Sequence, residues 1–433
     1  MKKSIFFKST LILLIGSLLT RTLGFFIRIV FTRTIGTEGI NLYSLIMPTY
    51  SLVVALTQLG LPMAISTIIA RDEKRGKKVL ISIIPIILIL NIIMMIILIF
   101  SSRFIAITLL DNESATYPIM SMSLILPFIS ISSILRGYFF GKQRMLPHTV
   151  SNVIEQITRL LIMLLFLPKL VSFGPIYAVS GFILLSIISE LVSIIIFLLY
   201  LPKGFRITKS DLHPDIATAK EVIDLSLPTV GGRIFGNIMY FFEPVILTYV
   251  LKLVGYSNTF IQTEYGIYNA YVLPLLMIPS FIVQALSTAL IPEISKSYHK
   301  HDIKHIKKRL KQSISLSLIL GIITNTLVFL YPEYLLNLVY NTNEGIEYIK
   351  VLSLFFILFN IETPLSSALQ ALGKPGLAFK ATTTGVIIKT ISIALFSLLH
   401  IGLYGLVIGE ILDIIFIVLI NIKSIKKILK NIK

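Results

Sequence analysis

The stretch LTRTLGFFIRIVFTRTIG, residues 19–36, is apolar enough to lie in a membrane, yet it contains three arginines, Arg21, Arg28 and Arg33. The chain around it is also apolar, because 55% of its 433 residues are hydrophobic and only 14% are charged. A helix needs roughly 20 apolar residues to cross a hydrocarbon layer about 30 Å thick. The sequence therefore indicates an integral membrane protein that keeps a few charges inside its spans.

Apolar runs of this length recur from end to end and predict an all-α protein with about twelve membrane-spanning helices. The N-terminal run lacks a small-x-small cleavage site and extends past a typical signal peptide, so we interpret it as the first span. The expected spans are residues 5–34, 41–70, 79–102, 114–140, 147–168, 174–201, 221–251, 264–295, 312–331, 345–372, 377–399 and 402–422.

The 39 lysines and arginines, which produce a net charge of +18, fall mostly on one side of this map. If the N-terminus is cytoplasmic, they lie at the two ends and in the even-numbered connections, such as RDEKRGKK (71–78) and KSYHKHDIKHIKKRLK (296–311). This positive-inside pattern predicts a multi-pass membrane protein with both termini cytoplasmic. The basic runs then lie beside anionic membrane lipids, and no nucleic-acid partner is expected.

The chain has no cysteine, which excludes disulfides, thiolate metal sites and a cysteine nucleophile. His301 and His305 share a helix face but have no suitable third ligand nearby, so neither a metal site nor a cofactor is expected. The aspartates form no DxD or DDxxD cluster of the kind that holds a metal in membrane glycosyltransferases and phosphotransferases. We therefore do not expect an enzyme.

The second half of the chain repeats features of the first half in the same order. The matches are RTLG (21–24) with RIFG (233–236), TE (37–38) with TE (263–264), and GK (141–142) followed by Arg159 with GK (373–374) followed by Lys389. Six spans per half put both halves in the membrane with the same orientation. The sequence thus predicts two six-helix lobes related by a pseudo-two-fold axis along the membrane normal.

The polar segment KGFRITKSDLHPDIATAKE (203–221) lies between the two repeats. We therefore expect an N-lobe over residues 1–202, a cytoplasmic linker over 203–220 and a C-lobe over 221–433. Two such lobes suit alternating access, in which a central site faces one side of the membrane and then the other. This organisation favours a transporter.

The arginines of the first span are candidates for substrate binding. Arg21 and Arg28 are two turns apart on one helix face, roughly 10.5 Å apart in height, with Gly24 between them. A guanidinium group suits phosphate oxygens, and the repeat adds Arg233 and Gly236. We predict that these five residues bind an anionic head group. In the alternative, each arginine reaches to the membrane interface or pairs with a membrane carboxylate.

Glu155 and Arg159 stand four residues apart in the fifth span, which is the favourable order for a helical ion pair. Local neutralisation of the two charges and contact with a ligand both fit this spacing. Together with Lys389 and Glu362, they are the candidate charges of a central cavity.

Glu243, Glu410 and Asp413 have no cation at helical spacing. They are candidates for binding a proton or Na⁺ that couples to movement of the lobes. A carboxylate paired in space with Lys389 or Arg233 would produce the same sequence pattern, so both interpretations stay open at this stage.

Several segments resemble the stage V sporulation protein B and polysaccharide transporter branch of the multidrug, oligosaccharidyl-lipid and polysaccharide (MOP) flippase superfamily. They are RTLGFFIRIVFTRTIGTEGINLYSLIMPTY (21–50), LPMAISTIIA (61–70), RGYFFGKQRMLPHTVSNVIEQITRLL (136–161), PSFIVQALSTALIPEISKSY (279–298) and QALGKPG (370–376). The resemblance implies the MOP flippase fold and the movement of lipid-linked sugars, including peptidoglycan precursors, between the leaflets. A polyprenyl-pyrophosphate sugar is an anion with an apolar tail, which suits a cationic, glycine-lined groove.

Two other classes compete with a flippase. A cation-coupled multidrug exporter of the same superfamily would need an acidic N-lobe cavity, whereas the first span contains arginines and no carboxylate. A membrane enzyme or a structural protein of envelope or spore assembly is the remaining alternative.

Overall fold

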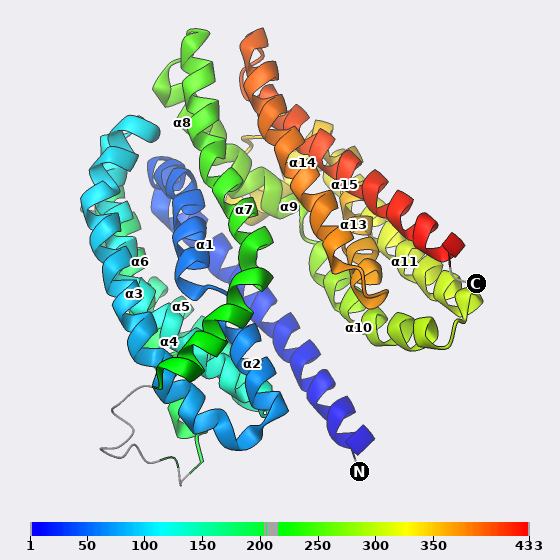
Figure 1. Ribbon diagram of the computed structural model, residues 1–433. Helices are drawn as coiled ribbons and strands as arrows, with labels where there is room; N and C mark the ends of the chain where they lie inside the picture. Colours follow the sequence, from blue (N-terminus) through cyan, green and yellow to red (C-terminus); the bar gives the residue numbers. More distant parts are fainter. Residues whose placement is uncertain (1, 203–204, 206–214, 432–433) are drawn as a thin grey trace. The chain divides into compact units, whose positions relative to one another are not determined.

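A computed structural model describes residues 2–202, 205 and 215–431, which are helical apart from turns and short connections, with no strand among them (Figure 1). The N-terminal helices are α1 (Lys2–Gln58), α2 (Leu61–Arg71), η1 (Glu73–Arg75), α3 (Gly76–Phe104), η2 (Ile105–Leu109), η3 (Glu113–Ala115), α4 (Thr116–Gly141), α5 (Met145–Val171) and α6 (Pro175–Leu199). The others are α7 (Ile216–Leu253), α8 (Asn258–Ile267), η5 (Tyr268–Val272), α9 (Leu273–Leu276), α10 (Ser280–His299), α11 (Ile303–Leu330), α12 (Pro332–Tyr340), α13 (Ile346–Ala371), α14 (Pro375–Phe396), η6 (Ser397–Leu399) and α15 (Tyr404–Asn431).

Ten helical stretches among the described residues are long and apolar enough to cross a membrane, which makes the chain a multi-pass membrane protein. The sequence predicts about twelve spans, and one reason for the difference lies at Gly36. This residue has φ 77° and ψ 169°, so α1 consists of two helices that meet at a kink. A Cβ atom at Gly36 would meet nothing within 4 Å, so its positive φ is what favours glycine there. The first arm of α1 corresponds to the first expected span, and the second arm together with α2 corresponds to the second.

The second reason is that the expected helix over residues 264–295 is broken. Helix α8 ends at Ile267, a π-helical turn and the short α9 follow, and α10 begins only at Ser280. Pro274 and Pro279 lie in this interval, and proline lacks the N–H group that a continuous helix requires. The structure therefore corrects the expectation of a single helix, although the apolar run itself remains.

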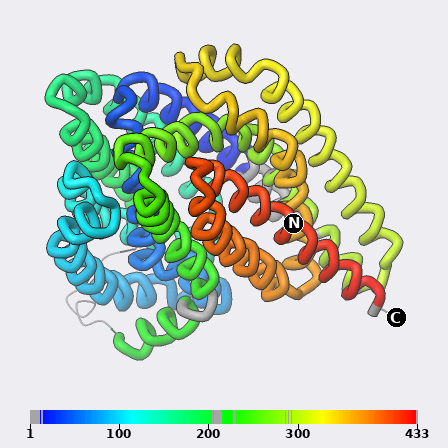
Figure 2. The backbone as a smooth tube through the Cα atoms, turned by 90° about the horizontal axis from the view of Figure 1, so that it is seen from above, coloured from blue at the N-terminus to red at the C-terminus, as the bar shows by residue number. Residues whose placement is uncertain are grey.

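The helices group into two compact units, Met1–Phe241 and Phe242–Lys433. In the first unit, α1 packs on α5 and α6, and α4 packs on α2, α3 and α6. In the second, α13 packs on α10, α11 and α15, and α14 lies beside α15 (Figure 1, Figure 2). The division falls within α7, because its first turns pack with the N-terminal helices. The lobe limits expected at residues 202 and 221 remain a prediction.

Each unit has its own apolar core. In the first unit, the core joins α2, α3, α4 and α6 to the start of α7 through side chains such as Ile65, Leu80, Phe139, Phe197 and Val222. In the second unit, the core joins α10, α11, α13, α14 and α15. Large apolar side chains elsewhere are exposed, as expected for surfaces that face lipid.

Helices α2 and α4 approach each other closely because α4 has two glycines on the contact face. A Cβ atom at Gly137 would lie 2.9 Å from Cα of Pro62, and one at Gly141 would lie 2.6 Å from Cβ of Ile69. Small residues four apart are typical of tight helix pairs in membranes. Packing therefore explains both glycines of the GYFFG segment.

The expected orientation can be tested by introducing single cysteines, because the native chain has none. Cysteines at the exposed positions Lys74 and Lys300 should be protected from a membrane-impermeant maleimide in intact cells, whereas cysteines at Glu113 and Asn343 should be labelled. Permeabilised cells provide the control, in which all four should react. Labelling at Lys300 in sealed cells would contradict a cytoplasmic location for this connection.

Candidate functional site

The predicted arginine face lies on the first arm of α1. Arg21 and Gly24 are half-buried, and Arg28, two turns further on, is exposed. A Cβ atom at Gly24 would meet no other atom within 4 Å, so packing does not explain this glycine. Open space therefore lies beside the backbone between the two arginines.

Arg21 forms no ion pair with any residue among 2–202, 205 and 215–431, although it lies within an apolar helix. An intramembrane cation is costly unless a partner, a polar cavity or the interface relieves that cost. No carboxylate among the described residues therefore neutralises Arg21, which differs from the alternative that it pairs with a membrane carboxylate. An anionic ligand therefore remains a candidate partner for Arg21.

A compact ionic cluster lies between α5 and α6 of the first unit. Arg159 Nη2 is 2.8 Å from Glu155 Oε1 and 3.7 Å from Glu190 Oε1, and Arg159 Nε donates a 3.4 Å hydrogen bond to Ser189 Oγ. The three charged side chains are largely buried, with exposed fractions of 24% for Arg159, 8% for Glu155 and 11% for Glu190. The i, i+4 spacing predicts the Glu155 contact, but Glu190 was not among the predicted site residues.

The arginine face of α1 and this cluster share a neighbour. Tyr43, on the second arm of α1, lies within electrostatic range of both Arg28 and Arg159. Its ring forms an aromatic cluster with Phe31, at 4.6 Å between centroids, and with Phe182 of α6, at 6.0 Å, and these two rings also contact each other at 4.4 Å. The kink at Gly36 thus folds α1 so that Arg28 and Arg159 lie in the same region of the first unit.

A second ionic cluster lies in the second unit, where one lysine bridges two carboxylates. Lys389 Nζ of α14 is 2.7 Å from Glu243 Oε2 of α7 and 2.7 Å from Glu410 Oε2 of α15. Tyr265 OH donates a 3.2 Å hydrogen bond to the other oxygen of Glu243. Of the two interpretations left open by the sequence, the structure therefore has Glu243 and Glu410 paired with Lys389.

The two clusters occupy related positions in the repeat. Arg159 of α5 pairs with Glu190 on the following helix, and Lys389 of α14 pairs with Glu410 on the following helix. Each cation also contacts a second carboxylate. Arg159 contacts Glu155 of its own helix, and Lys389 contacts Glu243 of α7. The sequence matches Arg159 with Lys389, but it does not align the two glutamates because the intervening loops differ in length.

Two further carboxylates lie near the second cluster. Asp413 Oδ1 is buried without a hydrogen-bond partner in the described residues, and a Cβ atom added to Gly385 would clash with it. Glu362 of α13 lies within electrostatic range of Asp413 and Glu410. The second unit therefore contains four acidic groups around one lysine. No three His, Asp or Glu side chains in the described part of the chain are arranged to hold a metal ion.

Arg233 and Gly236 lie on the part of α7 that groups with the first unit. Arg233 is exposed, and its Nη2 donates a 3.5 Å hydrogen bond to Gln58 Oε1 at the end of α1. A Cβ atom at Gly236 would meet nothing within 4 Å, as at Gly24. The repeat thus preserves an arginine beside an open glycine, but no contact joins Arg233 to Arg21.

Comparison with known proteins agrees with this architecture. Residues 6–298 match the polysaccharide biosynthesis protein family, and residues 269–395 match the MatE family. The chain is 33% identical to stage V sporulation protein B of Bacillus subtilis over 99% of its own length and 85% of the relative. It is 25% identical to the lipid II flippase MurJ of the same organism, over 89% of this chain and 76% of the relative.

Among solved structures, the inward-facing conformation of a multidrug resistance MATE family transporter of the MOP superfamily is similar in fold. The TM-score is 0.77 at 16% sequence identity, covering 96% of this chain and 95% of that one. The fold predicted from the sequence is therefore confirmed.

Proposed function

Because the chain belongs to the polysaccharide biosynthesis protein family of the MOP flippase superfamily, we propose that it is a flippase for a lipid-linked sugar. The substrate is a polyprenyl-pyrophosphate sugar, such as a peptidoglycan or polysaccharide precursor. It moves between the leaflets of a bacterial cytoplasmic membrane by alternating access, with both ends of the protein in the cytoplasm. The names of two relatives, a sporulation protein and a lipid II flippase, support this direction.

The observation that carries the proposal is the lack of an ion-pair partner for Arg21 in the described residues, beside the open space at Gly24. A pyrophosphate has several oxygens that can accept paired hydrogen bonds from a guanidinium group. The head group then crosses in a polar cavity while the apolar tail stays in lipid. No bond is made or broken, so the proposed protein is not an enzyme and uses no cofactor.

The acidic groups of the second unit provide a candidate site for a coupling ion. Glu243 and Glu410 share Lys389, so their charges are partly compensated. Asp413 and Glu362 form no ion pair with a cation among the described residues, and they lie close to the other acids of the cluster, so binding of a proton or Na⁺ would relieve the repulsion between these groups. We propose that Asp413 is the main coupling carboxylate, assisted by Glu362.

Reconstitution into liposomes tests the proposed function. An NBD-labelled polyprenyl-pyrophosphate sugar should move between leaflets faster in vesicles that contain the protein, as measured by dithionite bleaching of the outer leaflet. NBD-phosphatidylcholine is the control lipid and should not be accelerated. Equal acceleration of both lipids, or of neither, would contradict a flippase for lipid-linked sugars.

The open space at Gly24 leads to a second prediction. Gly24→Leu should fold normally, because a Cβ there meets no atom within 4 Å. Flipping should fall roughly tenfold or more, because the leucine occupies space that the head group needs and displaces it from the arginines. Thermal stability in detergent and flipping are measured on the same preparation.

Gly137→Leu is the matched control for this variant. Its Cβ would lie 2.9 Å from the backbone of Pro62, so the thermal stability of this variant should fall. Its flipping activity should fall as a consequence of that loss of stability. If Gly24→Leu also lost stability, the glycine would serve packing and not the substrate.

A further inference from the structure

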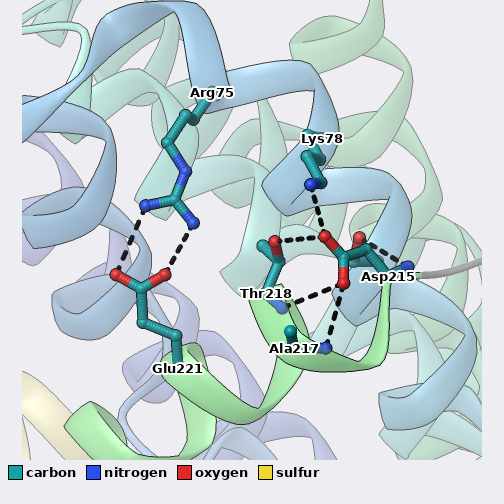
Figure 3. Close-up of polar contacts among 7 residues, drawn as sticks. Arg75, Lys78, Asp215, Ala217, Thr218 and Glu221 are labelled. Carbon is teal, nitrogen blue, oxygen red and sulfur yellow. Dashed lines mark hydrogen bonds and ion pairs between the residues drawn. The ribbon is translucent and has the colours of Figure 1, made fainter.

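The run RDEKRGKK (71–78), whose charges predict membrane orientation in the sequence, extends from the end of α2 through η1 into the first turn of α3. In the structure, two of these cations also contact the start of α7. Arg75 forms a two-pronged ion pair with Glu221, with Nη2–Oε2 at 2.6 Å and Nη1–Oε1 at 3.4 Å (Figure 3). Lys78 forms an ion pair with Asp215.

Asp215 makes four further contacts that fix the first turn of α7. Its Oδ1 accepts hydrogen bonds from the backbone N–H groups of Ala217, at 3.0 Å, and Thr218, at 3.4 Å. Its Oδ2 accepts from the Thr218 hydroxyl, at 3.0 Å, and its own N–H donates to Ser82 Oγ of α3, at 3.1 Å (Figure 3). Asp215 therefore caps α7 and ties the cap to α3.

The contact is also apolar. Ala219 and Val222, on the inner face of the same turns, are 1% and 0% exposed and belong to the core formed with α2, α3 and α4. Lys142 of the α4–α5 connection donates a 2.6 Å hydrogen bond to the backbone carbonyl of Glu73. The α2–α3 connection is thus joined both to α7 and to its neighbouring connection.

The charges at this contact stay ionised at ordinary pH. Hydrogen bonds from Lys78 and Thr218 lower the pKa of Asp215 to about 2, and the hydrogen bond from Arg75 lowers the pKa of Glu221. A carboxyl whose pKa falls on folding stabilises the fold above its unfolded pKa, near 4, and loses this effect as the pH drops through the folded value. The Asp215 contact is therefore complete throughout the neutral range.

We propose that residues 75–78 and 215–222 form a permanent clamp, which holds the start of α7 on the first unit throughout the transport cycle. Helix α7 continues without interruption into the second unit. Because its first turns are fixed by a cap, two ion pairs and buried side chains, a change in α7 during transport must occur beyond Val222.

Hydrogen exchange tests whether the ion pairs hold the start of α7. Glu221→Arg places two cations together, so exchange of the amides over residues 216–226 should rise roughly fivefold to tenfold. The double variant Arg75→Glu/Glu221→Arg should restore protection. Lys74→Glu reverses the charge of the residue beside Arg75, as Arg75→Glu does, but Lys74 forms no ion pair with α7 among the described residues, so exchange should stay unchanged. Unchanged exchange in Glu221→Arg would overturn the clamp.

A cross-link tests whether the clamp stays closed. The chain has no native cysteine, and the Ser82 side chain lies against the first residue of the clamp, with Oγ 3.1 Å from the Asp215 nitrogen. Ser82→Cys/Asp215→Cys therefore places two thiols at the contact while the Arg75–Glu221 ion pair and the buried side chains are kept, and oxidation joins the two thiols. The oxidised protein should retain at least about half of the flipping rate of its reduced form, since a permanent contact loses nothing when it is made covalent. Loss of flipping on oxidation with recovery on reduction would show that the clamp opens, and would overturn the proposal.

This second experiment rests on the proposed function, whereas hydrogen exchange does not. If the native protein moves no lipid-linked sugar, the flippase proposal fails and exchange still decides whether the ion pairs hold the start of α7. If native flipping is observed, the oxidised and reduced forms of one preparation decide whether the clamp opens.

Discussion

Replacing Arg21 with alanine should lower flipping of a pyrophosphate-linked sugar by roughly 10- to 100-fold, which corresponds to the loss of one or two charge-assisted hydrogen bonds of about 1.5–3 kcal/mol in total. The protein should remain folded, because Arg21 forms no ion pair among the described residues and its removal leaves no carboxylate unpaired there. Flipping in liposomes and thermal stability in detergent are the two measurements.

Two further variants sharpen this prediction. Arg21→Lys should recover only part of the activity, because an ammonium group supplies the charge without the two-pronged geometry. Arg33→Ala, an exposed arginine further along α1, is the matched control and should keep most of the activity. A parallel loss of stability and flipping in Arg21→Ala, with rescue by neutralising one carboxylate, would show that Arg21 supports the helix packing instead.

The largest loss of stability is expected for Lys389→Met. Among the described residues, Lys389 is the only cation within ion-pair distance of both Glu243 and Glu410, and this change removes it. The side chains of the two glutamates are 6% and 12% exposed. Removing one partner of a buried ion pair typically costs about 3–5 kcal/mol, because the remaining charge is desolvated and uncompensated. The midpoint of thermal unfolding in detergent should therefore fall clearly.

Neutralising the acids should reverse this effect. The triple variant Lys389→Met/Glu243→Gln/Glu410→Gln should regain most of the lost stability, since a buried ionic cluster can often be replaced by neutral side chains of similar size. Lys380→Met, an exposed lysine on the same helix, should change stability little. If Lys389→Met were as stable as the native protein, the cluster would be solvated and would not support the packing of α7, α14 and α15.

The candidate site was predictable to different degrees. Glu155 and Arg159 are four residues apart on one helix, so helical geometry alone brings them together, and the structure has them 2.8 Å apart. Lys389 and Glu243 are far apart in sequence, and their contact depends on how α7 packs against α14. No periodicity predicts such a contact, so sequence reasoning could name the residues but could not choose between pairing and ion binding.

The contacts of the clamp could not be predicted from the sequence either. The charges of the run at 71–78 predict only the side of the membrane on which it lies, because the positive-inside rule depends on charge alone. Its acidic partners, Asp215 and Glu221, lie at the end of a long polar segment. No pattern in that segment predicts which part of the protein these two side chains contact. Only the burial of Ala219 and Val222 in the first core brings them to Arg75 and Lys78.

The sequence by itself determined the membrane setting, the number of apolar runs, the repeat and the position of the arginines, because hydropathy and helical spacing act over one helix at a time. Tertiary structure alone decided the kink at Gly36, the break between α9 and α10, and the partners of Glu190, Glu410 and Lys389. Contacts between helices depend on side chains that are far apart in the chain and on the space between them, which no local pattern of residues records.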